Sequence, residues 1–176
     1  MKQTKFLPRI QKQTGDSCQC NALCGLMEYL ILKEYGKTVR LDPNELYERV
    51  RNSSDGREPK ISETLRYTKK MGVKDSKGKF WQLKKYKHVW RPWWHNKPML
   101  LSIDLERGEK FKDRLDKEGV MYSRIAGYHE VVMLEKIGKY LSCANSWGTK
   151  FGIDGYFFMP TILASQITHS AYKLTV

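Results

Sequence analysis

The chain is organised around the stretch Gln13-Thr-Gly-Asp-Ser-Cys18-Gln-Cys-Asn-Ala-Leu-Cys-Gly-Leu-Met-Glu28, in which a short polar turn leads into a helix. Apolar residues downstream of Cys18 follow the i, i+3, i+4 spacing of an α-helix. They are Ala22, Leu23, Leu26, Met27, Leu30 and Ile31. Few polar residues interrupt this surface, so we expect a helix that is buried from several sides and ends near Tyr35, before Gly36.

A cysteine stands at the start of this helix. Asp16 and Ser17 are good N-cap residues, so the helix is expected to begin at or beside Cys18. A thiol at this place feels the positive end of the helix dipole, which favours the nucleophilic thiolate. Cys20 and Cys24 lie on the same helix, and free cysteine is commonly a buried structural residue. This stretch alone is compatible with a nucleophile at Cys18 or with three core cysteines.

Length and composition indicate a soluble globular protein. The 176 residues are 40% hydrophobic and 29% charged, enough for one sizeable core or two small lobes. Residues 1–10 lack the apolar segment of a signal peptide, and no apolar run approaches the roughly 18–20 residues of a transmembrane helix. Four cysteines, three of them within residues 18–24, do not make a disulfide framework. We therefore expect reduced thiols, a cytoplasmic location and no membrane partner.

The net charge of +13 is concentrated in one segment. Residues 57–97 hold thirteen Lys or Arg against three Asp or Glu, a net +10 of the total. Aromatic residues are interleaved with the basic ones over residues 77–97, which suits contact with an acidic protein or a nucleic acid. A solvated basic face that aids solubility explains the same charges equally well.

Secondary-structure signals change character along the chain, and we find no internal repeat or low-complexity segment. After an extended lead-in over residues 1–12 and the first helix, Asp42-Pro43 is an N-cap followed by a proline at the first helical position. A third helix is expected from Ser62 to Gly72. The expected strands cover residues 98–105, 128–137, 139–145, 156–159 and 171–176, with a loop over 106–119 and a turn at 161–165.

This order predicts an α+β fold in a single domain that spans residues 1–176. A helical lobe at about residues 13–75 is followed by an antiparallel sheet lobe at about residues 76–176, which residues 1–12 join. The cleft between the two lobes is the expected place for a functional site.

A second informative stretch is the pair of strands expected over residues 128–137 and 139–145. A hairpin turning about Ile137–Gly138 would set His129 opposite Asn145. The amide oxygen of Asn145 could then bond one ring nitrogen of His129 and leave the other nitrogen for a thiol. A base within reach of the thiol, oriented by a third group, is the arrangement that a cysteine nucleophile needs.

The residues around this hairpin resemble a known family. Asn145-Ser-Trp-Gly-Thr-Lys-Phe-Gly-Ile-Asp-Gly-Tyr156 is similar to the Asn-Ser-Trp-Gly-x-x-[Trp/Phe]-Gly-x-x-Gly-Tyr signature of papain-like cysteine proteases. Gly-Tyr-His129 followed by Val-Val resembles that family's Gly-His-Ala-Val strand, and Ser-Cys18 resembles its Gly-Ser-Cys. Residues 74–97 match no part of the family pattern.

The resemblance implies a fold and an activity. The fold would be papain-like and two-lobed, with a β-barrel-like sheet lobe and the active site in the cleft, of the compact bacterial or viral type that has no propeptide. The activity would be that of a cysteine endopeptidase, which hydrolyses peptide bonds through a thioester acyl-enzyme at Cys18 and needs neither a cofactor nor a metal. A peptide or protein substrate and a viral or phage origin are consistent with this type.

The same resemblance assigns roles to individual residues. His129 would act as base and acid, and Asn145 would orient it. Gln13 and the Cys18 backbone N–H would form the oxyanion hole, where each donor commonly contributes about 2.7–4 kcal/mol to the transition state. Trp147 would shield the bond between His129 and Asn145 from water. The expected substrate contacts are Gly56 and Tyr128.

Three positions depart from the family pattern. Gln13 lies five residues before Cys18 where the family has six, so Gln11 is an alternative donor for the oxyanion hole. Gln19 replaces the tryptophan that usually follows the nucleophile. Glu130 replaces the small residue after the histidine, and its carboxylate either perturbs the histidine pKa or faces outward.

Other interpretations remain open. The same triad could pass the acyl group to an amine, as an acyltransferase or transpeptidase does. Residues 77–97 could make the chain a nucleic-acid-binding module with a vestigial protease fold. Cys20 is a less suitable nucleophile because Ser-Cys18, Ala22 and Glu28 fit the helix register together. A zinc site from the three helix cysteines and His129 is disfavoured, because Cys-x-Cys-x3-Cys matches no common zinc spacing.

Overall fold

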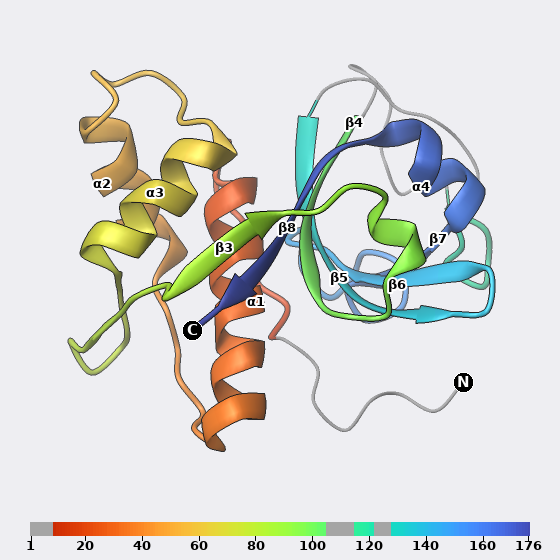
Figure 1. Ribbon diagram of the computed structural model, residues 1–176, viewed down its shortest axis with the longest axis horizontal. Helices are drawn as coiled ribbons and strands as arrows, with labels where there is room; N and C mark the ends of the chain where they lie inside the picture. The colour runs from red at the N-terminus through yellow and green to blue at the C-terminus, as the bar shows by residue number, and fades with distance from the viewer. Residues whose placement is uncertain (1–8, 105–114, 122–127) are drawn as a thin grey trace.

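The computed structural model describes residues 9–104, 115–121 and 128–176 (Figure 1). Three predicted elements lie partly outside the described residues: the lead-in at 1–12 (its residues 1–8), the strand at 98–105 (its last residue) and the loop at 106–119 (its residues 106–114). Within them the chain forms three helices followed by a large antiparallel sheet. This order confirms the predicted α+β class.

The three N-terminal helices are α1 (Cys18–Tyr35), α2 (Pro43–Asn52) and α3 (Ile61–Met71). α1 ends as expected, with Gly36 in the left-handed conformation at a φ of 64° and its N–H bonded to the Leu32 carbonyl. The Asp42 carboxylate accepts the N–H groups of Asn44 and Glu45, each at 3.0 Å, and so caps α2. Local sequence signals therefore decide where α1 ends and where α2 begins.

The remaining elements form two sheets and two short helices. The small sheet pairs β1 (Val73–Lys74) with β2 (Phe80–Trp81). The large sheet has the order β3-β8-β4-β5-β6-β7 and is antiparallel throughout. Its strands are β3 (Lys85–His88), β4 (Met99–Asp104), β5 (Tyr128–Ile137), β6 (Tyr140–Ala144), β7 (Tyr156–Pro160) and β8 (Thr168–Thr175). The short helices are η1 (Pro92–Trp94) and α4 (Thr161–Ile167).

The large sheet is open. Among the described strands β3 and β7 form its two edges and are not paired with each other, so the barrel-like closure that we expected is not seen. The turn expected at residues 161–165 is the helix α4, because Ala164 and Ile167 are buried against the sheet. β3 lacked a sequence signal because most of its residues are exposed; it is a strand because it pairs with β8.

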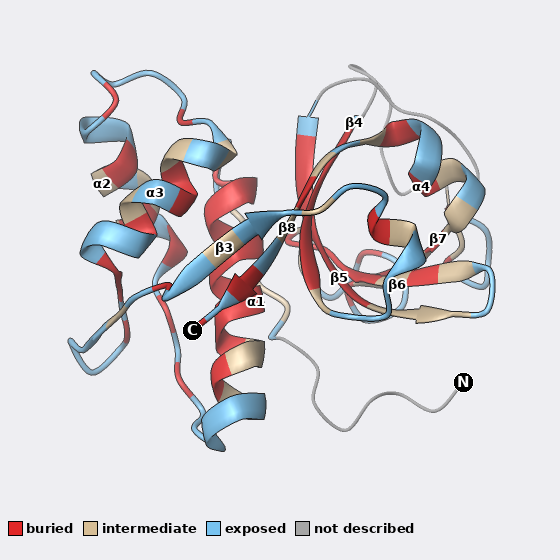
Figure 2. Ribbon diagram, in the orientation of Figure 1, coloured by how far each residue is buried: buried red, intermediate tan, exposed pale blue. Residues whose placement is uncertain are grey.

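α1 is the centre of the molecule, as its sequence predicts. It lies between α2 and α3 on one side and the large sheet on the other (Figure 1), and most of its length is buried (Figure 2). One face of the sheet joins a core with the helices, which includes Leu100 and Val132. The opposite face carries a second core with α4, which includes Leu101 and Val131. β4 and β5 therefore read as continuous apolar runs because both of their faces are buried.

Candidate active site

Cys18 is the first residue of α1, and 8% of its surface is exposed. Hydrogen bonds tie the preceding turn to the helix. Ser17 Oγ donates to the Thr14 carbonyl at 2.8 Å, and Asn21 Nδ2 donates to the Ser17 carbonyl at 2.9 Å. Ser17 is the N-cap residue, as expected, but its hydroxyl makes no capping bond to the helix. The turn before Cys18 is thus held by Thr14 and Asn21, and not by the predicted side-chain cap.

The Cys18 thiol faces a carboxylate. Its Sγ donates to Glu130 Oε2 at 2.8 Å and lies 3.7 Å from Gln19 Oε1. Ser102 Oγ donates to the other oxygen of Glu130 at 3.2 Å, from the position on β4 that pairs with Glu130. Glu130 is itself buried, with 8% of its surface exposed.

Strand geometry explains why Glu130 reaches the nucleophile. Successive side chains on a strand point to opposite faces, so Glu130 shares the face of Val132 and His129 shares the face of Val131. Val132 packs in the core that contains α1, and Val131 packs in the core on the other side of the sheet. The sequence left two options, that Glu130 perturbs the histidine pKa or that it faces outward. Glu130 faces inward, but the group that it touches is the Cys18 thiol.

The protonation of Cys18 differs from the sequence-based expectation. Burial, followed by the negative charge of Glu130, raises the pKa of the Cys18 thiol far above its ordinary value. A helix dipole contributes only about 0.3–1 kcal/mol, whereas desolvation of a charged group beside a like charge costs considerably more. The prediction that the helix start favours the thiolate is therefore wrong for this resting structure. Cys18 is a neutral thiol.

His129 and Asn145 form a short, buried hydrogen bond. His129 Nε2 lies 2.6 Å from Asn145 Oδ1, and the Ser146 backbone N–H donates to the same oxygen at 2.8 Å. Only an oxygen can accept from a backbone N–H, so the orientation of the Asn145 amide is defined. Nε2 of His129 must then carry the proton. In the neutral ring, Nδ1 is consequently the basic nitrogen, which is the form that can take a proton from a thiol.

Aromatic side chains cover this pair. The Trp147 ring lies 4.7 Å from the His129 ring, centroid to centroid, and Phe151 contacts Trp147 edge-on at 5.4 Å. Burial lowers the pKa of His129 to about 4, although the hydrogen bond that His129 donates to Asn145 acts in the opposite direction. His129 is therefore neutral at pH 7. The Trp147 ring lies beside the His129 ring, and its shielding role stays a prediction.

The hairpin that carries these residues differs in register from the prediction. Its turn is centred one residue later, with Ile137 paired to Tyr140, and a bulge near Leu134 shifts the pairing again before Val132 meets Ala144. His129 and Asn145 consequently lie beyond the last paired residues and are not directly opposite. Their side chains meet because both project from the same end of the hairpin.

The two candidate oxyanion donors lie in different surroundings. Gln13 is half-buried on the turn before Cys18; its Nε2 donates to the Gly15 carbonyl at 3.0 Å, and its Oε1 accepts the Ser146 hydroxyl. One of the two amide hydrogens of Gln13 is thus used. Gln11 lines a small pocket of about 20 Å³, and its Nε2 has no hydrogen-bond partner among the described residues. Gln13 stays the predicted donor.

The two predicted substrate contacts, Gly56 and Tyr128, lie on different elements, the loop after α2 and the start of β5. Gly56 has a φ of 77°, and its N–H bonds the Arg51 carbonyl at 3.0 Å, so it closes the loop after α2. It lines a surface hollow of about 480 Å³ together with Asp16, Glu58 and the turn before Cys18. Tyr128 is 69% exposed and contacts the His169 ring at 5.3 Å.

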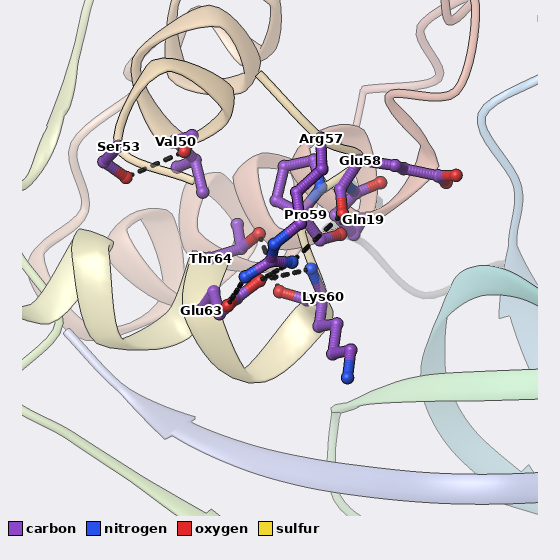
Figure 3. Close-up of polar contacts among 9 residues, drawn as sticks. All are labelled: Gln19, Val50, Ser53, Arg57, Glu58, Pro59, Lys60, Glu63 and Thr64. Carbon is purple, nitrogen blue, oxygen red and sulfur yellow. Dashed lines mark hydrogen bonds and ion pairs between the residues drawn. The ribbon is translucent and has the colours of Figure 1, made fainter. Parts of the chain in front are cut away.

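Gln19 has a role that sequence reasoning missed. Its Nε2 donates to the Pro59 carbonyl at 3.1 Å and so ties the start of α1 to the loop before α3 (Figure 3). Arg57 pairs with Glu63 across the same loop, and Glu63 also accepts the Lys60 N–H at 2.9 Å. The glutamine at a position where tryptophan is usual was the sequence signal for an unusual contact at Gln19. The partner could not be predicted, because no local pattern identifies a backbone carbonyl in another loop.

Two absences concern the described residues only. Their His, Cys, Asp and Glu side chains form no group of three or more that could hold a metal ion. None of their helices is both long enough and apolar enough to cross a membrane. The four cysteines are free and buried.

The fold is that of papain-like cysteine proteases, which confirms the fold that the sequence resemblance implied. The chain is similar to xylellain, a cysteine protease from Xylella fastidiosa, with a TM-score of 0.78, 15% identity, and 98% of this chain and 84% of that one covered. It is also similar to the cysteine protease CMS1MS2 from Carica candamarcensis, with a TM-score of 0.79, 17% identity, and 97% and 93% covered.

A chain from a structure of the mite allergens Blo t 1 and Der p 1 matches as well, with a TM-score of 0.71, 18% identity, and 97% of this chain and 67% of that one covered. No protein-family model matches the sequence. No curated protein matches it either. The likeness is therefore one of fold, and the activity has to be argued from the site.

Proposed function

We propose that this protein is a cysteine endopeptidase that hydrolyses peptide bonds through a thioester at Cys18. The observation that carries the proposal is the bond between His129 and Asn145, which puts the ring proton on Nε2 and leaves Nδ1 as the basic nitrogen. Cys18, on α1, contacts Glu130, the residue next to His129 on β5, but these two neighbouring strand side chains point to opposite faces of the sheet. The proposal therefore requires the His129 ring to turn toward the thiol at the start of β5 for the proton transfer.

Proton transfer accompanies attack in this mechanism. The thiol and the imidazole are both neutral at rest, because burial raises the pKa of Cys18 and lowers the pKa of His129 to about 4. Cys18 Sγ attacks the peptide carbonyl carbon while its proton passes to His129 Nδ1. The imidazolium then protonates the leaving amine, and a thioester remains. Water, deprotonated by His129, releases the acid and restores the thiol.

Other groups support the charged states along this path. The Cys18 backbone N–H and one amide hydrogen of Gln13 would donate to the oxyanion of the tetrahedral intermediate. Asn145 Oδ1 holds the imidazolium, and Trp147 keeps water from that bond. The polar turn from Thr14 to Asp16 and Gly56 border the hollow in which an extended peptide could lie.

A digest of a peptide library, read by mass spectrometry, tests the proposal. Wild-type protein should cut peptides, and Cys18→Ala should cut none. Cys20→Ala is the matched control, because Cys20 is on the same helix but has no exposed surface, and it should retain cleavage. Cleavage by Cys18→Ala would overturn the proposal. Products that form only with an added amine would identify the acyltransferase alternative.

We propose an accessory contact with single-stranded nucleic acid through the basic aromatic segment. Trp90 and Trp94 are 77% and 67% exposed, and the Arg91 guanidinium lies 4.6 Å from the centroid of the Trp94 ring. Lys85 and Lys87 are exposed on the adjoining edge strand β3. Exposed rings beside cations suit base stacking with phosphate contacts. The fluorescence anisotropy of a labelled oligothymidine should show binding that weakens with salt, and no binding at low salt would remove the proposal.

A further inference from the structure

Glu130 is a buried carboxylate that the proposed mechanism does not use. It forms no ion pair with a Lys, Arg or His among the described residues. Its two oxygens each accept one neutral donor, the Cys18 thiol and the Ser102 hydroxyl. Buried charges are usually paired, because an unpaired one is costly to remove from water. Burying the Glu130 carboxylate therefore destabilises the fold, and no cation among the described residues offsets this.

The carboxylate retains capacity for a further ligand. An ionised carboxylate offers about four acceptor sites, and two donors leave about two of them open. Burial raises the pKa of Glu130, whereas the bonds from Cys18 and Ser102 act in the opposite direction by stabilising its charged form. The site is thus built to receive a hydrogen-bond donor beside the reacting sulfur. A positively charged donor would satisfy both the open acceptor sites and the charge.

The charges around the nucleophile are opposite to those of the whole chain. The net charge is +13, yet the ionised groups that act on the Cys18 thiol and on Glu130 are acidic: Glu130 acts on Cys18, and Glu58 acts on Glu130. Gln19 holds the backbone of Pro59, next to Glu58, against the start of α1 (Figure 3). Local negative charge on a basic protein selects a cation at this place.

We propose that Glu130 is a specificity-determining residue, which receives the ammonium or guanidinium group of a Lys or Arg side chain of the peptide substrate, next to the bond that Cys18 attacks. This inference rests on the proposed peptidase function. A bound cation also neutralises the charge that disfavours the Cys18 thiolate, so the same contact that selects the substrate makes the nucleophile more reactive. Substrates without the cation lose both effects.

A pair of small thiol reagents of opposite charge tests the charge preference without any cleavage. Aminoethyl methanethiosulfonate carries an ammonium, and sulfonatoethyl methanethiosulfonate carries a sulfonate. In each case the Cys18 sulfur displaces methanesulfinate and forms a mixed disulfide, which peptide mapping by mass spectrometry locates. Cys20, Cys24 and Cys143 have no exposed surface, so labelling of the folded protein reports on Cys18.

We compare the labelling rate of the cationic reagent with that of the anionic one. This ratio should be roughly tenfold higher for wild-type protein than for N-acetylcysteine amide. Glu130→Gln keeps the size of the side chain and one of its two acceptor oxygens, but removes the charge, and should remove this preference. Glu135→Gln, which makes the same change farther along β5, should keep it. An unchanged preference in Glu130→Gln would overturn the proposal. If the variant fails to fold, the comparison of wild-type protein with N-acetylcysteine amide still tests the proposal. Equal rate ratios for the protein and the free thiol would overturn it.

Peptides extend the test to substrates. A panel that differs only in Lys, Arg, Met or Leu at each position near the cut should show the best cleavage by wild type with Lys or Arg at one position. Glu130→Gln should reduce that preference by roughly tenfold. If wild type cuts nothing, the peptidase function fails while the reagent result still stands. If wild type cuts without favouring a cation, this inference fails and the peptidase function stands.

Discussion

The buried, neutral state of His129 predicts a specific loss of stability in mild acid. Burial lowers the pKa of His129 to about 4 in the folded protein, against 6.5 for an ordinary histidine. Between these values the unfolded chain binds a proton that the folded protein does not. The free energy of unfolding is therefore unaffected above pH 6.5 and falls as the pH drops toward 4. The difference amounts to about 3 kcal/mol in total, of which about 2 kcal/mol is lost between pH 7 and pH 4.5.

Urea unfolding of wild type and His129→Gln at the two pH values measures this loss. Glutamine keeps a donor for Asn145 but does not titrate. Glu28 and Glu130, whose pKa values burial raises, titrate in both proteins and largely cancel in the comparison. Wild type should lose about 2 kcal/mol more than the variant. Equal losses would show that His129 is not held neutral, and would refute the tautomer on which the proposed proton transfer depends.

Three further changes probe the same region. Asn145→Ala removes an oxygen that accepts two hydrogen bonds and should lower kcat/KM for a cleaved peptide by roughly tenfold to a hundredfold; a rate equal to wild type would contradict its orienting role. Gly155→Ala should destabilise the fold by at least about 2 kcal/mol in urea, because its Cβ would lie 2.4 Å from Ile10, whereas Gly138→Ala meets no atom within 4 Å and should cost less. Asp42→Ala should cost about 1 kcal/mol by the same method, and no change would show that the cap is not needed.

Residues whose role depends on local pattern were predictable from the sequence. The buried faces of α1, its end at Gly36 and the Asp42 cap follow from periodicity and capping chemistry alone. β5 has the bounds that its sequence predicts, because an apolar run between a glycine-containing segment and a glycine turn has few alternatives. The meeting of His129 and Asn145 was also foreseen, although the register of their hairpin was not, since a bulge has no signature in either strand.

Residues whose role depends on long-range pairing were not predictable. The inward orientation of Glu130 follows from the alternation along β5, but its contact with Cys18 depends on how α1 sits on the sheet. The neutral thiol follows from that contact and from burial, neither of which a helix-start rule includes. β3 is a strand only because β8 pairs with it, and Gln19 meets a backbone carbonyl from a distant loop.

The measurement that tests the central claim most directly is the mass of the enzyme during turnover. A peptide ester that acylates quickly and hydrolyses slowly should add the mass of its acyl group to wild type when the reaction is quenched in acid. Peptide mapping should place that mass on Cys18, as a thioester that hydroxylamine removes, and Cys18→Ala should show no adduct. Acylation of another residue, or turnover by Cys18→Ala at the wild-type rate, would contradict the assignment of Cys18 as the nucleophile.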